Sequence, residues 1–561
     1  MNRKEFIQTA LGGVPFDLVL KNGQIVNVFT GQILKGDVAV KDGMIVGVGA
    51  YSGTNEIDID GKYILPGFVN AHVHVESSMV TPPAYAREEL KWGTTTLITD
   101  PHEIANVGGL KGIETMLAMA EHSHVNYYVM LPSCVPSTPF EHAGAVLHAE
   151  DLKRLKSNKK VLGLGEMMNS VGVLNGDKEI LDKLDTFGDC IVDGHAPQVS
   201  GKQLQAYRIA GIDTDHESVS YEEALEKLQC GMAVLVREGS ASKNLEAIIQ
   251  GVVKDDIDTA YMAFCTDDKH LADVQAEGTI RFCIKKAVAL GLSPIKAIQM
   301  ASINAARIYG LKNIGAVAVG YKADMVVVED LKDFEVLSVY KDGQNIAELP
   351  PIENLKFPID MINTVHLAPF DENVFEVPRA ESYTVIQIVE NQIITDRRQM
   401  TDAEIRTGLA DGTIRKIAVM ERHKATGQYA CAYISGYGLK HGAVATTVAH
   451  DSHNLIVIGD NNRDMLTAAK EIERIQGGYV IAADGHVKRA LPLRFGGLMS
   501  LKPTEQFILA LNNIIQTAYA MGVNPQIDPF ITLSFMALPV IPSVRITDMG
   551  LFDVDKFEFI K

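Results

Sequence analysis

The middle of the chain repeats one pattern eight times, a short apolar run followed by an amphipathic stretch. The apolar runs are residues 64–75, 94–101, 126–134, 160–166, 190–195, 211–216, 232–238 and 261–267. Helical stretches such as KEILDKLDTFG and YEEALEKLQCG lie between them. Eight strand–helix units in about 250 residues have the size and rhythm of a (β/α)8 barrel. We therefore predict an α/β fold with a TIM-like barrel over residues 62–310.

Shorter segments with a β pattern flank this barrel. Residues 17–60 contain short apolar runs separated by Asn-Gly and Asp-Gly pairs, which are hairpin signals, and a similar pattern returns after residue 314. We predict one small β-sandwich built from both ends, with residues 1–61 as its N-terminal part and residues 311–365 as its C-terminal part. Residues 366–561 are predicted to form an additional α/β or α+β domain.

Composition argues against several classes of protein. The formal net charge of −18 argues against a nucleic-acid-binding surface. The sequence contains no apolar run of about 18 residues and no secretory leader pattern, so we predict neither a membrane span nor export. Six cysteines without a CxxC pair are typical of reduced thiols in a cytoplasmic protein. We expect a cytoplasmic protein; the small-molecule substrate is implied only by the resemblance described below.

Charged or metal-binding residue types end nearly every predicted barrel strand. The C-terminal ends of barrel strands meet at one face, where active sites are built. His72 and His74 are two residues apart on the first strand, so their side chains share a face and can bind one ion. Later strands end with Asp100, His102, Glu166, His195, His216, Arg237, Glu238, Asp267 and Asp268. A single histidine at a strand end is more often structural, so the prediction depends on their convergence.

Histidine and carboxylate ligands without thiolates suit zinc, manganese or iron. At the end of the fourth strand, VLGLGEMM contains no lysine, and Glu166 is the only anionic candidate there. A glutamate can bridge two cations through its two oxygens. The residues alone therefore indicate a metal centre without deciding which metal it holds.

These strings resemble a known family. LPGFVNAHVHVESS, the later single histidines and Asp267 resemble the amidohydrolase superfamily. HVHVESSM, TDPHEIANV, GLGEMMN, DGHAP and AHDSHN resemble its bacterial adenine deaminases over nearly the full length. The resemblance implies hydrolytic deamination of adenine to hypoxanthine and ammonia by a metal-activated hydroxide, a purine salvage reaction. It also implies two Mn²⁺ or Fe²⁺ ions per active site, with Zn²⁺ as an alternative, and a homodimer.

The resemblance also implies roles for the predicted ligands. His72 and His74 would bind the first ion, His195 and His216 the second, and Glu166 would bridge the two. Asp267 would act as general base and then general acid, and also as a metal ligand. Asp100 is a further candidate ligand or orienting group, although it could equally cap the helix that follows Pro101.

Four charged residues are candidates for binding the purine ring: Glu76, His102, Arg237 and Glu238. Arg237 and Glu238 are also candidate catalytic residues, because a guanidinium or a protonated carboxyl would offset charge that develops on the ring. A buried Arg–Glu pair that holds a loop explains these two residues equally well.

In the C-terminal domain, AHDSHN places His450, Asp451 and His453 close together. A second metal site, a lid over the barrel mouth and a hydrogen-bonded turn are all compatible with this spacing.

Two alternative functions remain open. One is hydrolysis of a cyclic amide or imide, as in dihydroorotases or hydantoinases, but these usually carry a carboxylated lysine on the fourth strand. The other is a non-enzymatic scaffold, which the retention of all expected ligands argues against.

Overall fold

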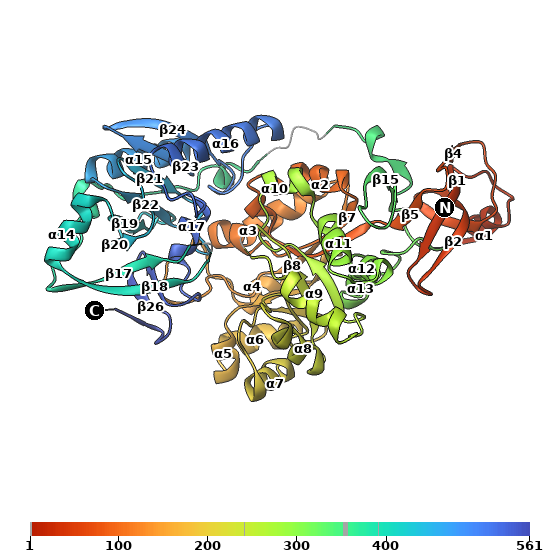
Figure 1. The fold of residues 1–561 in the computed structure, drawn as a ribbon, viewed down its shortest axis with the longest axis horizontal. Coiled ribbons are helices and arrows are strands. Elements are labelled where there is room, and N and C mark those ends of the chain that lie inside the picture. The colour runs from red at the N-terminus through yellow and green to blue at the C-terminus, as the bar shows by residue number, and fades with distance from the viewer. Residues whose placement is uncertain (1–2, 241, 352–356, 391, 561) are drawn as a thin grey trace.

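A small β domain, a barrel and a C-terminal domain follow one another along the molecule (Figure 1). The structure is a computed structural model that describes residues 3–240, 242–351, 357–390 and 392–560. The small β domain and the C-terminal domain lie at opposite ends of the barrel (Figure 1). A short helix α1 (Arg3–Ala10) precedes the small β domain. No helix in the described part of the chain is long and apolar enough to cross a membrane.

Eight parallel strands form the barrel, as predicted. They are β6 (Phe68–Val73), β7 (Thr94–Thr99), β8 (Asn126–Leu131), β9 (Val161–Met167), β10 (Ile191–Gly194), β11 (Thr214–Asp215), β12 (Ala233–Arg237) and β13 (Met262–Cys265). Strands β6 to β10 pair in sequence order, as do β11 to β13. The Asp213 amide donates to the Val192 carbonyl (2.8 Å), and the Asp267 amide donates to the His72 carbonyl (3.0 Å). These bonds join the two sets of strands and close the barrel.

Amphipathic helices surround the strands. Helix α9 (Leu245–Lys254) buries Leu245, Ile248, Ile249 and Val252, which recur at the spacing of one helix face. The other barrel helices are α2 (Pro82–Lys91), α3 (His102–Ala120), α4 (Ala149–Lys153), α5 (Ser170–Asn175), α6 (Lys178–Phe187), α7 (Gly201–Ile209), α8 (Tyr221–Gln229), α10 (Leu271–Glu277), α11 (Ile280–Ala289), α12 (Pro294–Met300) and α13 (Ile303–Ile308). Burial of such apolar faces against a parallel sheet is what stabilises the helices in a fold of this class.

The small β domain is a mixed sheet built from both sides of the barrel segment. Its strands are β1 (Leu18–Asn27), β2 (Gln32–Lys41), β3 (Met44–Gly49), β4 (Glu56–Asp58), β5 (Tyr63–Pro66), β14 (Met325–Val328), β15 (Val336–Lys341) and β16 (Gln344–Asn345). Strand β5 pairs with β14, which joins the two parts. Asp42-Gly43 forms the β2–β3 hairpin, whereas Asn22-Gly23 lies inside β1 at an irregularity of register, so only the first pair is a hairpin turn.

The first predicted run, 64–75, is wrong as a single strand. It divides at Gly67 into β5, which belongs to the small β domain, and β6, which begins the barrel. A Cβ atom on Gly67 would lie 2.2 Å from Thr95 Oγ1, so the chain passes from one sheet to the other where a side chain has no room.

The C-terminal domain is built on an eight-stranded, largely antiparallel sheet, so it is of the α+β type. In spatial order the strands are β18 (Thr395–Thr401), β17 (Ser382–Ile388), β20 (Tyr429–Ser435), β19 (Ile414–Met420), β22 (Leu455–Gly459), β21 (Ala443–Thr446), β23 (Gly478–Ala483) and β24 (His486–Pro492). Its helices are α14 (Asp402–Asp411), α15 (Asn462–Ile475), α16 (Thr504–Ala520) and α17 (Ile531–Ser534), and a small sheet of β25 (Val544–Thr547), β26 (Gly550–Asp553) and β27 (Glu558–Phe559) follows.

The C-terminal domain packs on the end of the barrel where the strands finish. The Ser500 amide donates to the Met79 carbonyl (2.7 Å), just beyond β6. Asn454 Nδ2 donates to the His142 carbonyl (2.7 Å) in the loop after β8. Apolar residues of both units, including Ile104 and Phe495, belong to one continuous core. Residues that follow the barrel strands are therefore covered by another domain.

Glu141, in the loop after β8, is a buried carboxyl at this contact. It accepts a hydrogen bond from Ser137 Oγ (2.8 Å). Burial and the nearby carboxylate of Asp451 raise the pKa of Glu141 from 4.5 to about 8. The group is therefore protonated in the folded protein at neutral pH, although it would be ionised in the unfolded chain.

We expect the Glu141→Gln variant to gain stability relative to the wild type as pH rises. Folding takes up a proton at Glu141 between pH 4.5 and about 8, so the free energy of unfolding of the wild type falls across this window. The slope has an upper limit of about 1.4 kcal/mol per pH unit. Thermal unfolding of both proteins at about pH 5 and about pH 8 measures the difference. A difference in Tm that does not grow with pH would contradict the raised pKa.

Candidate active site

Six side chains converge inside the covered end of the barrel, and we call them the histidine cluster: His72, His74, Glu166, His195, His216 and Asp267. His72 lies in β6 and His74 just after it, and Glu166 lies in β9. The other three follow β10, β11 and β13. All six are buried except His195, which is partly exposed. The structure therefore brings together residues that span about two hundred positions, because parallel barrel strands end at one face.

Glu166 lies between two sets of histidines. Its Oε1 is 3.1 Å from His74 Nε2 and 4.0 Å from His72 Nε2. Its Oε2 is 2.8 Å from His195 Nδ1 and 3.1 Å from His216 Nε2. Although burial opposes ionisation, the surrounding imidazoles hold the pKa of Glu166 well below its usual range. Each oxygen of an ionised carboxylate thus faces its own group of nitrogen atoms.

Asp267 is held against the same cluster by Arg237. Its Oδ1 lies 3.0 Å from His74 Nε2 and 3.5 Å from His72 Nε2. Its Oδ2 accepts a hydrogen bond from Arg237 Nη1 (2.7 Å), and the same guanidinium pairs with Glu217. Burial opposes ionisation of Asp267, but the Arg237 charge and the histidines hold its pKa well below the usual range. Arg237 thus contacts the cluster through Asp267. The glutamate that pairs with Arg237 is Glu217 and not the adjacent Glu238.

The donor atoms of the cluster suit divalent cations. The Nε2 atoms of His72 and His74 are 3.1 Å apart and so point at a common region. Burial and His216 lower the pKa of His72 to about 3, which leaves its ring neutral, and His216 Nε2 has no hydrogen-bond partner among the described residues. Ligand atoms lie within 4.8 Å of one another in the sets His72–His74–Glu166, His72–His216–Asp267 and Glu166–His195–His216. Imidazole nitrogens and ionised carboxylates in such sets are the ligands that Zn²⁺, Mn²⁺ and Fe²⁺ take.

Asp100 and His102 lie beside Glu166. Asp100 Oδ2 accepts a hydrogen bond from the Glu166 amide (2.9 Å), and no side chain caps the helix that begins at His102. His102 Nδ1 is 3.2 Å from Glu166 Oε1. The set Asp100–His102–Glu166 is a further candidate group of ligands. Asp100 therefore orients the backbone of Glu166, whereas the helix-capping alternative finds no support.

Glu76 and Glu238, both predicted to bind substrate, have different surroundings. Glu76 lies in the short 3-10 helix η1 (Val75–Ser78) and accepts a hydrogen bond from the Ile104 amide (3.3 Å). Burial and Glu103 raise the pKa of Glu76 to about 7. Glu238 accepts a hydrogen bond from Lys286 Nζ (2.7 Å) on α11, on the outside of the barrel, and contacts no member of the histidine cluster among the described residues. The predicted contact of Glu238 with a substrate ring thus gains no support from its position.

The AHDSHN loop, residues 449–454, meets the barrel at Glu103. His450 Nδ1 is 3.0 Å from Glu103 Oε1, and His453 Nε2 is 3.2 Å from Glu103 Oε2. Asp451 Oδ1 lies 3.8 Å from His102 Nε2. The Ala449 amide donates to His453 Nδ1 (3.1 Å), so a neutral His453 carries its proton on Nε2, the atom that lies near Glu103. This tautomer has no nitrogen left for a metal, and the loop lies across the end of the barrel.

Two glutamates of the site are not among the predicted residues: Glu103, which contacts both histidines of this loop, and Glu217, which pairs with Arg237. Each directly follows a predicted site histidine, His102 in TDPHE and His216 in DTDHE. Nothing local marks either glutamate, since its partner lies on a distant segment.

Family models match both large units of the chain. The model of the Amidohydrolase family matches residues 63–346, and the model of the Adenine deaminase C-terminal domain matches residues 392–558. The first covers the barrel and the second covers the domain that closes its mouth.

Curated relatives match over the full length. An adenine deaminase of Desulfitobacterium hafniense (strain Y51) is 46% identical over 561 residues, covering 100% of this chain and 98% of the relative. One of Clostridium acetobutylicum is 45% identical over 570 residues, covering 99% of each. A solved structure titled as an adenine deaminase has 15% identity and a TM-score of 0.46, covering 59% of this chain and 99% of that one. The chain therefore belongs to the adenine deaminase family, metal-dependent hydrolases of the amidohydrolase superfamily.

Proposed function

We propose that the protein converts adenine and water into hypoxanthine and ammonia, as a purine salvage enzyme. The observation that carries the proposal is the position of Glu166, whose two oxygens face separate histidine groups in the covered end of the barrel. The names of the relatives, adenine deaminase at 46% and 45% identity, support the choice of substrate.

In this proposal the histidine cluster holds two divalent cations, Mn²⁺ or Fe²⁺, with Zn²⁺ as an alternative. His72 and His74 would hold one cation and His195 and His216 the other, with Glu166 within reach of both groups of histidines. Divalent cations at such a site lower the pKa of water toward neutrality and stabilise developing negative charge. Asp100 keeps Glu166 in place through the hydrogen bond to its amide.

In this proposal Asp267 transfers a proton from the attacking water to the leaving amine. Its carboxylate accepts a proton from the water whose oxygen adds to C6 of adenine, and then gives a proton to the exocyclic nitrogen as the C6–N bond breaks and ammonia leaves. Arg237 supports this role, since its bond to Oδ2 fixes the carboxylate and leaves Oδ1 facing the histidines. Glu76, with a pKa near 7, is the candidate donor to a ring nitrogen at neutral pH.

An assay of adenine turnover tests the proposal. We expect protein reconstituted with Mn²⁺ to release ammonia from adenine, with the ultraviolet change that accompanies hypoxanthine formation. Removal of metal by a chelator should abolish this activity, and Mn²⁺ should restore it. Ring opening of dihydroorotate or a hydantoin, without ammonia release from adenine, would contradict the assignment.

The proposal includes a cytoplasmic location and a homodimer. All six cysteines are free, which is consistent with a reducing compartment. The homodimer is inferred from the resemblance alone, and sedimentation analysis of the metal-loaded protein tests it.

A further inference from the structure

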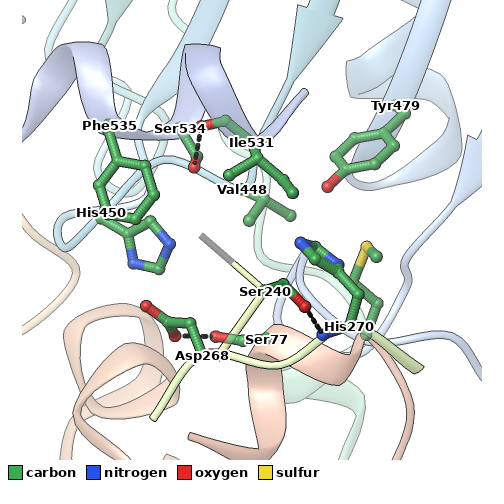
Figure 2. Close-up of a pocket in the computed structure, with 11 residues that line it drawn as sticks. Ser77, Ser240, Asp268, His270, Val448, His450, Tyr479, Ile531, Ser534 and Phe535 are labelled. Carbon is green, nitrogen blue, oxygen red and sulfur yellow. Dashed lines mark hydrogen bonds between the residues drawn. The ribbon is translucent and has the colours of Figure 1, made fainter. Parts of the chain in front are cut away.

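A cavity lies between the end of the barrel and the C-terminal domain (Figure 2). About 20 Å³ of it is accessible to the centre of a water-sized molecule. Ser77, Ser240 and Asp268 line it from the barrel, and His450, Ile531 and Phe535 line it from the C-terminal domain. The two units thus form opposite walls of one space.

The barrel wall of the cavity adjoins the histidine cluster. Asp268 follows Asp267, and the ligand atoms of His74, Asp267 and Asp268 lie within 4.8 Å of one another. Ser77, three residues after His74, donates a hydrogen bond to Asp268 Oδ1 (Figure 2). A molecule in the cavity would therefore lie directly beside the groups proposed to carry out the reaction.

The opposite wall is largely apolar and includes two aromatic rings. The Phe535 and His450 rings stack with centroids 4.7 Å apart and planes 15° from parallel. Ile531 and Val448 extend this surface in Figure 2. Planar apolar walls with a few polar groups are typical of sites for small aromatic ligands.

His450 is the polar group of this wall. Its Nδ1 lies 3.0 Å from Glu103 Oε1, which leaves Nε2 as the ring nitrogen that Glu103 does not engage. Burial opposes protonation, but the Glu103 carboxylate, with Asp268, raises the pKa of His450 to about 9. At neutral pH, Nε2 therefore carries a hydrogen that needs an acceptor.

We propose that this cavity holds the purine ring and that His450 Nε2 donates a hydrogen bond to ring nitrogen N3 or N7. The inference rests on the proposed function and deepens it, because it makes the C-terminal domain part of the substrate site. Both nitrogens are acceptors in adenine and in hypoxanthine. The contact therefore binds the ring and leaves the chemistry to the histidine cluster.

Two substitutions distinguish the role of His450 Nδ1 from that of His450 Nε2. Asparagine places its amide near the position of Nδ1, so His450→Asn can keep the bond to Glu103 but loses Nε2. Glutamine reaches the position of Nε2, so His450→Gln can keep the donor to the ring but loses the bond to Glu103. The matched control is His453→Asn, which weakens the contact with Glu103 from a residue that does not line the cavity.

We expect His450→Asn to raise KM for adenine about tenfold, with full metal content, and His450→Gln and His453→Asn to change KM less. The atom that accepts the bond is identified with 3-deazaadenine and 7-deazaadenine as inhibitors. The wild type should bind one of them about tenfold more weakly than the other, and His450→Asn should lose this discrimination. If KM for adenine rises more in His450→Gln and His453→Asn than in His450→Asn, the role of His450 is the contact with Glu103 that joins the two domains, and not binding of the ring.

A variant at another position keeps the test independent of His450. Ile531→Trp should fill the cavity from the opposite wall, raise KM for adenine and leave the metal content unchanged. Unchanged discrimination between the two analogues in His450→Asn, together with normal KM in Ile531→Trp, would overturn the inference. If the wild type does not deaminate adenine, the proposed function fails, and calorimetric binding of adenine to the wild type and to His450→Asn still decides whether the cavity holds a purine.

Discussion

Replacing Asp267 by asparagine is expected to lower kcat for adenine about 1,000-fold while metal remains bound. The amide keeps the shape of the carboxylate and one oxygen, so the contacts to His72 and His74 can persist. It cannot accept a proton from water or deliver one to the leaving amine. The loss should therefore appear in kcat, with metal content close to that of the wild type.

The matched control for this variant is Asp213→Asn. Asp213 precedes β11, so it lies at the opposite end of the barrel, where its carboxylate accepts a hydrogen bond from the Val192 amide (3.1 Å). The same change of charge there should leave kcat within about twofold of the wild type. Nearly normal turnover in Asp267→Asn would show that another group moves the proton.

Replacing Glu166 by glutamine is expected to lower the metal content and to abolish turnover. The Glu166 oxygens face His74 on one side and His195 with His216 on the other. Glutamine has only one oxygen, and its NH₂ group would point hydrogens at the second set of nitrogen atoms. Metal analysis of the purified variant, before and after reconstitution with Mn²⁺, measures the effect.

Glu238→Gln is the control for removal of a buried carboxylate at the same end of the barrel. The partner of Glu238 is Lys286 on α11. We therefore expect the Glu238→Gln protein to retain its metal, even if the substitution lowers its stability. Full metal occupancy with normal turnover in Glu166→Gln would refute the bridging role. Turnover of Glu238→Gln also tests whether Glu238 binds substrate despite its position.

The barrel and the convergence of the histidines were predictable because both follow from local patterns. Eight apolar runs separated by amphipathic stretches predict parallel strands, and parallel strands bring their ends to one face. His72 and His74 share a side because side chains alternate along a strand. The division of run 64–75 was not predictable in this way, because β5 and β6 are both apolar and separate only at a crowded Gly67.

The roles of Arg237 and Glu238 illustrate what the sequence could not provide. The two residues are adjacent, so their side chains lie on opposite sides of the strand end, and only Arg237 contacts Asp267. Which of them faces inward depends on the register of β12 against its neighbours, and an error of one residue reverses the answer. Partners such as Glu103 and Glu217 come from other elements, and a single sequence does not reveal such pairs.

The contact between the AHDSHN loop and Glu103 implies that the barrel depends on the C-terminal domain, so loss of the coding region for that domain should not be tolerated. A deletion that removed the last third of the coding region would leave a barrel with Ile104 and its apolar neighbours facing water. It would also leave Glu103 without the two histidines that contact it. We therefore expect the two coding segments to be inherited together, and a shortened copy to yield an insoluble, inactive product.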